Sequence, residues 1–289
     1  MRVVSYNIQY GTGKDGRVDL ARIAAEIADD SDGADIIALQ EVERFSSATG
    51  GIDQPAEFAA LFPDHHWVYG PGVDVDASTD MDKGRRRQFG NMVLSRWPIL
   101  SKRNHLLPKV AYPDHLALQR SALEAVIETP LGGLRVYSVH LGHVGAQERQ
   151  AQIIALMAHI FDSPADGGVI SGAKASKHWT MDGPLPPMPK PAIALGDFNL
   201  APADDEYTLL VGPENHKYGR LTTTRLLVDA WTAAGHGGTG GDTCYDHFGQ
   251  SLRIDYCFMT PDFAPHLQAI SVGTEAQGSD HQPLYIDFK

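Results

Sequence analysis

The sequence has few cysteines and no long apolar run, and each shortage excludes a class of protein. Two of the 289 residues are cysteines, Cys244 and Cys257, so no disulfide framework stabilises the fold. We expect two buried free thiols, with a single bond between neighbouring strands as the alternative. No run of about 18 apolar residues occurs, so we expect no transmembrane segment. The opening residues MRVVSYNI read as a strand and not as a signal peptide, which favours a cytoplasmic protein.

Basic residues are also in short supply. The chain has 24 Lys and Arg against 36 Asp and Glu, a formal net charge of -12. Such a charge does not attract nucleic acid by itself, although a local basic groove or bound metal ions can override it. The length allows one large domain or two small ones, and no linker or short repeat divides the chain. We therefore expect a single domain over residues 1–289.

Strand-like segments outnumber helical ones along the chain. Apolar, β-branched and aromatic residues predict strands at 2–9, 35–42, 65–70, 89–99, 119–129, 134–142, 192–199, 253–260, 269–274 and 283–288. Helical spacing of apolar residues predicts helices over 18–30, with Asp19 as N-cap, over 146–161 and near 203–210. Many strands with few helices between them indicate an α+β fold, with sheet packed on sheet and helices outside.

One segment interrupts this pattern. Residues 163–191 are rich in Gly, Pro and Ser and form a longer connection than compact domains usually contain. The segment carries Lys174, Lys177, His178 and Trp179. We interpret it as an insertion loop, either a mobile connection or a lid that brings cationic and aromatic contacts to a substrate.

Polar residues follow the apolar strands at their ends. In LGDFN, Asp197 and Asn199 flank Phe198 and would project to one side of a strand, because strand side chains alternate. Taken singly, an Asp or Asn at a strand end is typical of a turn. The repetition favours one polar edge where several strands end. The other members of this set are Asn7, Glu41, His140, Asp255, Asp280 and His281.

The ordered motifs SYNIQ, LQEV, SVHL, GDFN, RIDY and SDHQPL resemble the endonuclease/exonuclease/phosphatase superfamily. That group contains pancreatic-type deoxyribonuclease, exonuclease III, neutral sphingomyelinases and inositol-polyphosphate phosphatases. The resemblance runs from residue 3 to residue 288. It implies a four-layer α/β/β/α sandwich, with two packed mixed β-sheets flanked by helices, and hydrolysis of a phosphate ester that depends on Mg²⁺ or Mn²⁺.

The resemblance also implies a metal site. Mg²⁺ prefers carboxylate and amide oxygens, and the matching positions are Glu41, Asn7 and Asp280. One or two ions are expected, and a second ion would use Asp197, Asn199 and His281. The metal would neutralise a phosphoryl oxygen and stabilise the leaving group.

The catalytic assignments follow from the same resemblance. Asp197 would orient or deprotonate the attacking water, and Asn199 would hold phosphoryl oxygens. His281 would lie beside the scissile phosphate, with Asp255 as its carboxylate partner. His140 would donate a hydrogen bond to the developing charge or a proton to the leaving oxygen. Which of the two histidines is the acid or base stays open.

Two further residues match phosphate-binding positions. Arg120 corresponds to a phosphate-binding arginine, with a surface salt bridge as the alternative. Asn91 in FGNMVLS corresponds to a position near the site.

The substrate is less well determined than the reaction. The basic run KGRRRQ at 83–88 could contact a phosphate backbone or form a solvated loop tip. The acidic composition favours a small-molecule or lipid-head-group phosphoester, and DNA or RNA is the alternative substrate. No G-x-S-x-G or H-E-x-x-H motif supports a serine hydrolase or zinc enzyme. A binding module without chemistry is the least favoured alternative, and the oligomeric state is not indicated.

Overall fold

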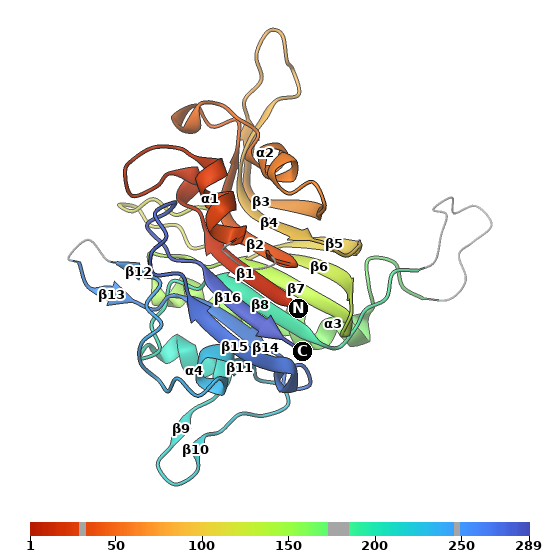
Figure 1. Cartoon of the computed structure of the whole chain (residues 1–289), viewed down its shortest axis with the longest axis vertical. Helices are drawn as coiled ribbons and strands as arrows, with labels where there is room; N and C mark the ends of the chain where they lie inside the picture. The colour runs from red at the N-terminus through yellow and green to blue at the C-terminus, as the bar shows by residue number, and fades with distance from the viewer. Residues whose placement is uncertain (29–32, 173–184, 246–248) are drawn as a thin grey trace.

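The computed structural model of the chain describes residues 1–28, 33–172, 185–245 and 249–289. Within these residues, two six-stranded β-sheets pack face to face (Figure 1). The first sheet has the strand order β15 (Leu267–Val272), β16 (Leu284–Phe288), β1 (Arg2–Asn7), β2 (Ile36–Arg44), β4 (Arg86–Ser95) and β3 (His66–Asp76). The second has the order β11 (Val228–Asp229), β14 (Asp255–Met259), β8 (Ala192–Asp197), β7 (Gly132–His140), β6 (Ser121–Thr129) and β5 (Ile99–Leu106).

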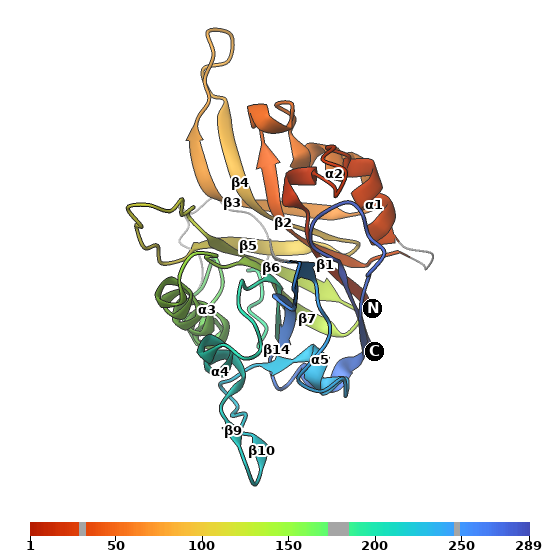
Figure 2. The ribbon, with the colours of Figure 1, turned by 90° about the vertical axis from the view of Figure 1, so that its left-hand side faces the viewer.

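Helices cover the outer faces of both sheets, which gives four layers (Figure 2). The helices α1 (Leu20–Ala28) and α2 (Gln54–Leu61) lie on the first sheet, and α3 (Ala146–Asp166) and α4 (Asp205–Val211) lie on the second. The short helix α5 (Ala230–Ala233) packs against β14 and β15. The remaining elements are η1 (Gln9–Gly11), η2 (Ser47–Thr49), η3 (Ala264–His266) and the small pairs β9 (Glu214–Asn215) with β10 (Gly219–Arg220) and β12 (Cys244–Tyr245) with β13 (Ser251–Leu252). The predicted sandwich with helices outside is confirmed.

Three apolar clusters fill the spaces between the four layers. The central cluster lies between the sheets and joins side chains such as Ile36 of β2 and Leu123 of β6, both fully buried. Burying one such aliphatic side chain contributes about 1.5–3 kcal/mol. The outer clusters lie beneath the helices, where α1 buries Ile23 and Ile27 at the predicted helical spacing. The sequence therefore sets both the helix face and the sheet face that meet there.

Each sheet has one pair of parallel strands near its centre. Strand β1 is parallel to β2, with α1 between them in the chain, and β7 is parallel to β8, with α3 between them. Parallel neighbours end at the same edge of a sheet, because a crossover returns the chain to the edge where it started. Asn7 pairs with Gln40 at the end of β1 and β2, and His140 pairs with Asp197 at the end of β7 and β8. This topology brings the predicted polar residues to one edge.

A buried polar layer joins the two sheets behind that edge. The Gln40 Nε2 donates to Ser138 Oγ at 2.9 Å, and the Asn91 Nδ2 donates to the backbone oxygens of Ser121 at 2.8 Å and Ser138 at 3.1 Å. Such hydrogen bonds contribute about 1 kcal/mol each and are costly to leave unmade. They fix how the sheets sit relative to each other where the site lies.

Several details differ from the sequence-based expectations. The strand expected over 89–99 is two strands, since β4 ends at Ser95 and β5 begins at Ile99. Residues 163–166, expected within the irregular segment, belong to α3, and residues 173–184 lie outside the described residues. Both cysteines are free and buried, as expected. In the described part of the chain, no helix has the length and apolar character needed to cross a membrane.

Candidate active site

A cavity of about 260 Å³ opens at the edge where β1, β7 and β8 end, beside the middle of β2. Its lining residues are Tyr10, Glu41, Phe89, Leu118, Arg120, His140, His143, Asp197, Asn199 and His281. Larger cavities of about 650 Å³ and 430 Å³ lie beside α1 and β15 and beside the end of α3. Volume alone does not identify a site, and the cavity of about 260 Å³ brings together several charged groups of perturbed pKa, among them Glu41, Asp197 and His281.

Glu41 reaches this cavity because β2 is irregular in its middle, where Glu41 lies. The pairing of β2 with β4 shifts register between Leu39 and Val42, and Glu41 has a φ of 61°. A left-handed conformation at a non-glycine residue costs roughly 1–3 kcal/mol and is typical of functional sites. The described residues offer no hydrogen bond to the Glu41 carboxylate, whose Oε1 lies 3.9 Å from His140 Nε2. Burial, with Asp197 and Asp280 nearby, raises the pKa of Glu41 to about 7.

Asp197 and Asn199 both line the cavity, for a different reason from the one predicted. Strand β8 ends at Asp197, and Asn199 has a φ of 51°, so strand alternation does not place it. Instead, the Asn199 backbone N–H donates to Asp197 Oδ1 at 2.9 Å, and the Asn199 side chain donates to the Leu141 carbonyl at 3.1 Å. The turn and the site are thus one feature: one carboxylate oxygen shapes the turn, and the other faces the cavity's polar groups.

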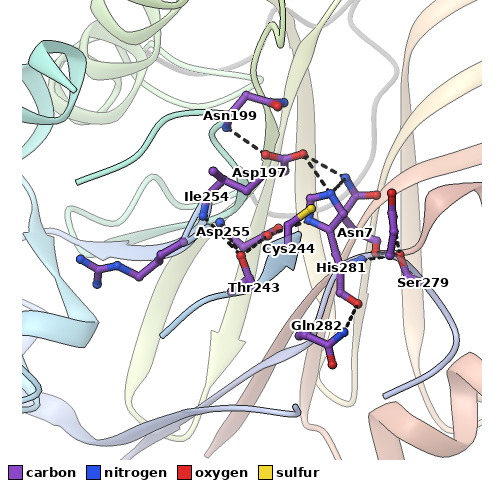
Figure 3. Close-up of polar contacts among 12 residues, drawn as sticks. Asn7, Asp197, Asn199, Thr243, Cys244, Ile254, Asp255, Ser279, His281 and Gln282 are labelled. Carbon is purple, nitrogen blue, oxygen red and sulfur yellow. Dashed lines mark hydrogen bonds and ion pairs between the residues drawn. The ribbon is translucent and has the colours of Figure 1, made fainter. Parts of the chain in front are cut away.

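Three side chains surround Oδ2 of Asp197, the carboxylate oxygen that does not bond to the turn. Asn7 Nδ2 donates to Asp197 Oδ2 at 3.0 Å, and His281 Nε2 lies 3.9 Å from the same oxygen (Figure 3). His140 Nε2 lies 3.3 Å from this oxygen. Burial would raise the pKa of Asp197, but the two imidazoles and the Asn199 N–H outweigh it and hold the pKa well below its usual range. Asp197 is therefore ionised at neutral pH.

His281 is held from its far side by a second carboxylate. Its Nδ1 lies 2.8 Å from Asp255 Oδ2, and Thr243 Oγ1 donates to the same oxygen at 2.6 Å (Figure 3). Burial lowers the pKa of His281, but Asp255 outweighs it and raises the pKa well above the usual range. The pair leaves His281 Nε2 directed to Asp197 and Asn7, from which it lies 3.9 Å and 3.4 Å.

Arg120 is buried beside this network and lies between two histidines. Its Nη1 contacts His140 Nδ1 at 3.0 Å, and its Nη2 contacts His143 Nδ1 at 3.0 Å. The guanidinium can only donate, so both imidazole nitrogens accept and carry no proton. Burial and the Arg120 charge accordingly lower the pKa of His140 to about 4. The alternative of a surface salt bridge is wrong, because Arg120 is 6% exposed and contacts no carboxylate among the described residues.

The remaining predicted residues lie around this centre. Asn7 is buried, and its Oδ1 accepts from the Gln9 backbone at 3.1 Å. Asp280 is exposed and accepts from Gln9 Nε2 at 2.8 Å, so it borders the site without lining the cavity. Asn91 lies in the polar layer between the sheets, with its amide nitrogen bonded to backbone and its Oδ1 buried without a partner.

Five residues at the site were not predicted. His143 contacts Arg120 and Thr243 contacts Asp255, while Tyr10, Phe89 and Leu118 line the cavity. Only His143 had a sequence signal, because it follows His140 at a distance of three residues. The others are visible only once distant segments come together.

The fold is a two-sheet sandwich, and ionisable side chains line a pocket near the ends of its central strands. The chain belongs to the Endonuclease/Exonuclease/phosphatase family, which matches residues 4–281. Members of this family are hydrolases that act on phosphoesters.

Solved structures share the fold at low sequence identity. An endonuclease/exonuclease/phosphatase from Beutenbergia cavernae is 24% identical with a TM-score of 0.64, over 100% of this chain and 71% of that one. A mannosyl-6-phosphatase from Bacteroides thetaiotaomicron is 18% identical with a TM-score of 0.67, over 100% and 99% of the two chains. A 3' phosphatase from Neisseria, bound to a product DNA hairpin, is 19% identical with a TM-score of 0.58, over 100% of this chain and 99% of that one.

One curated relative matches a short stretch. DNA-(apurinic or apyrimidinic site) endonuclease 2 of Schizosaccharomyces pombe is 49% identical over 37 residues. The matched stretch is 13% of this chain and 7% of that protein.

Proposed function

We propose that the chain is a divalent-metal-dependent phosphoester hydrolase that acts on a small-molecule or lipid-head-group phosphoester. The observation that carries this proposal is Arg120, a buried cation that contacts two neutral imidazoles and no carboxylate among the described residues. Two of the five guanidinium N–H groups are engaged there, and the buried Nε has no partner. A phosphate would supply the missing charge and the missing acceptors, because its oxygens match the guanidinium geometry.

The residues at the cavity also suit a divalent cation. Glu41 offers a desolvated carboxylate with no hydrogen bond among the described residues. Asn7, which pairs with Gln40 of β2, offers an amide oxygen that accepts one backbone N–H. Mg²⁺ is commonly held by one or two carboxylates and keeps several waters, so a full cage of protein ligands is not required. Glu41, Asn7 and the bordering Asp280 would hold Mg²⁺ or Mn²⁺, and a second ion would use Asp197, Asn199 and His281. When bound, the metal would neutralise charge on the phosphoryl and leaving oxygens.

The other side chains divide the remaining work. Asp197, ionised and surrounded by donors, would accept a hydrogen bond from the attacking water and so orient it. His281, whose charge Asp255 stabilises, would donate through Nε2 to the phosphoryl group. His140 is neutral with its proton on Nε2, so it would donate a hydrogen bond and not act as a strong acid. Asn199 would help to hold the phosphoryl oxygens.

Two observations favour a small substrate over nucleic acid. The cavity of about 260 Å³ holds a phosphate and a modest organic group. The basic run at 83–88 is largely engaged with neighbours: Arg86 pairs with Asp74 at 2.7 Å, and Arg85 lies over the Phe45 ring at 4.5 Å. A nuclease is the alternative, and the fold relatives include both a sugar-phosphate phosphatase and a DNA 3' phosphatase.

The first experiment is a substrate panel with Mg²⁺, with Mn²⁺ and with EDTA. The panel is p-nitrophenyl phosphate, bis-p-nitrophenyl phosphate, sphingomyelin and plasmid DNA, with release of phosphate or alcohol as the readout. Metal-dependent cleavage of a small or lipid ester supports the proposal. Plasmid cleavage that falls steeply with salt would instead select the nuclease alternative. No cleavage of any substrate by metal-bound protein would contradict the proposed hydrolase.

A further inference from the structure

The loop between β7 and α3 contains a histidine with one engaged and one free nitrogen. His143 Nδ1 accepts from Arg120 Nη2 at 3.0 Å, which places the His143 proton on Nε2. The described residues offer no partner to that Nε2, and the side chain lines the cavity. His143 is also more exposed than His140, the other imidazole on Arg120.

The loop that carries His143 is held firmly on both sides. Gly142 donates its backbone N–H to Gln152 Oε1 at 2.7 Å, and its carbonyl accepts from Arg149 Nη1 at 3.4 Å. Leu141 donates its backbone N–H to the carbonyl of Asp197 at 2.9 Å. Because α3 and β8 both anchor this loop, His143 is set in place before any ligand arrives.

The Arg120 side chain has few other supports. Its Nε is buried without a partner, and the Phe89 ring lies 6.0 Å from its guanidinium carbon. Within the described residues, its hydrogen bonds are the two to His140 and His143. Without His143, one bond would remain, and the guanidinium could turn away from the cavity.

We propose that His143 is a positioning residue that fixes the Arg120 guanidinium for binding a phosphate oxygen. The inference rests on the proposed phosphate-binding role of the cavity. His143 acts through Arg120, so its effect on ligand binding depends on Arg120 being present. A residue that only supported the loop would change binding equally with and without Arg120.

A double-mutant cycle separates these two roles. The variants are His143→Ala, Arg120→Ala and the double variant, measured for KM and kcat on the substrate found in the panel and for the Kd of orthophosphate. We expect His143→Ala to raise KM and Kd about tenfold while kcat changes by less than about threefold. In the Arg120→Ala background, the same substitution should change Kd by less than about twofold. Equal losses in both backgrounds would overturn the proposal.

Two further variants control for folding and for chemistry. His143→Asn places an amide oxygen near the position of Nδ1 and should restore Kd to within about threefold of the parent. His115→Ala removes an exposed imidazole from the loop before β6, whose recorded partner is Asp114, and should change nothing. If His143→Asn binds phosphate as poorly as His143→Ala, the acceptor role is contradicted.

A spectroscopic readout distinguishes this proposal from the proposed function. Side-chain ¹⁵N NMR of the parent protein should show His143 Nδ1 unprotonated and Nε2 protonated, and Arg120→Ala should abolish that fixed tautomer. If the fixed tautomer is absent, the positioning role is wrong whatever the enzyme hydrolyses. If the tautomer is present but no substrate is cleaved, the hydrolase proposal fails, and the orthophosphate Kd still decides the role of His143.

Discussion

Arg120 and Arg135 are both buried against the second sheet, but their surroundings differ. Arg135 lies within β7 and is fully buried, with all three of its nitrogens bonded to oxygens. The acceptors are the carbonyls of Pro189, His159, Ile160 and Lys190 and the hydroxyl of Tyr137, at distances from 2.8 to 3.4 Å. Among the described residues, Arg120 hydrogen-bonds to two imidazole nitrogens, and its buried Nε has no partner.

The partners of Arg135 explain why it is there. Pro164 lies within α3 and has no N–H for the Ile160 carbonyl, which would otherwise accept a helical hydrogen bond. The Arg135 Nη2 donates to that carbonyl at 2.8 Å and to the Lys190 carbonyl at 2.8 Å. Arg135 therefore joins β7, the end of α3 and the segment that leads into β8.

The comparison shows what distinguishes a structural arginine from a candidate ligand-binding one. Burial does not distinguish them, because both are buried. The lack of a carboxylate partner does not distinguish them either, because neither pairs with one among the described residues. The difference is whether the donors are already satisfied. Arg135 has its acceptors in the fold, whereas Arg120 faces a cavity with donors unused, so only Arg120 gains from an anion.

The largest expected effect is the loss of turnover when the Glu41 carboxylate is replaced. We expect Glu41→Gln to reduce kcat/KM about 10³-fold or more, because it removes the main proposed metal ligand. Folding should be kept, since the Glu41 carboxylate has no recorded hydrogen bond to lose among the described residues. Turnover, Mn²⁺ titration calorimetry and thermal unfolding test this. If the variant keeps its turnover and binds Mn²⁺ tightly, Glu41 is not a metal ligand.

The two arginines should respond in opposite ways to the same substitution. Arg135→Met should destabilise the fold by about 3–5 kcal/mol, because several buried carbonyls lose their donors. Arg120→Met should leave the free energy of unfolding within about 1 kcal/mol of the parent but reduce kcat/KM about 10²-fold. Urea unfolding and turnover of both variants provide the measurement. Equal destabilisation by both substitutions would mean that Arg120, like Arg135, has a structural role.

The sequence predicts the central features because they depend on local pattern and chain order. Apolar strands followed by polar residues indicate Asn7, Glu41, His140 and Asp197, and parallel pairing then brings those strand ends together. The helix face of α1 follows from its apolar spacing and the Asp19 cap, whose Oδ1 accepts from Arg22 N at 2.9 Å.

Other features depend on contacts that no local pattern carries. The left-handed conformation of Glu41 is hidden, because Gln40 and Glu41 read as a continuing strand. The end of α3 was missed, because Pro164 suggests a break and the compensating donor comes from Arg135 in another element. Most of strand β5 has no apolar strand pattern, because it is rich in polar residues that bond to neighbouring elements. An example is Asn104, whose side chain donates to the Pro71 carbonyl at 2.8 Å.

A smaller effect should appear when metal binding is followed against pH. The pKa of Glu41 is raised to about 7, so below that pH the ion must displace a proton. We expect the Mn²⁺ affinity to rise about tenfold per pH unit up to about pH 7 and then to level off. The free energy of unfolding of the metal-free protein should change with pH in the opposite direction. The raised pKa of Glu41 stabilises the fold at low pH, and this contribution is lost as the pH rises through 7.

Calorimetry in buffers of different ionisation enthalpy measures the coupled proton directly. Near pH 6, binding should release about one proton from the parent protein, and near pH 8.5 almost none. Glu41→Gln should release none at either pH. Proton release that persists in this variant would assign the titrating group elsewhere.

The smallest expected effect comes from loosening the hydrogen bonds that hold His281. Like Arg135, His281 is held by groups of the fold itself. Thr243 Oγ1 donates to the same Asp255 oxygen that His281 Nδ1 contacts, and it also accepts from the Asp255 backbone N–H at 3.1 Å. Thr243→Val keeps the shape but removes these two bonds and a third, which the hydroxyl accepts from the Ile254 backbone N–H at 3.3 Å, so we expect kcat/KM to fall about three- to tenfold. Thr243→Ser keeps the hydroxyl and should stay within about twofold of the parent. If valine and serine variants show equal kcat/KM, the orientation of His281 does not depend on this hydroxyl, and Asp255 alone is sufficient to hold the imidazole.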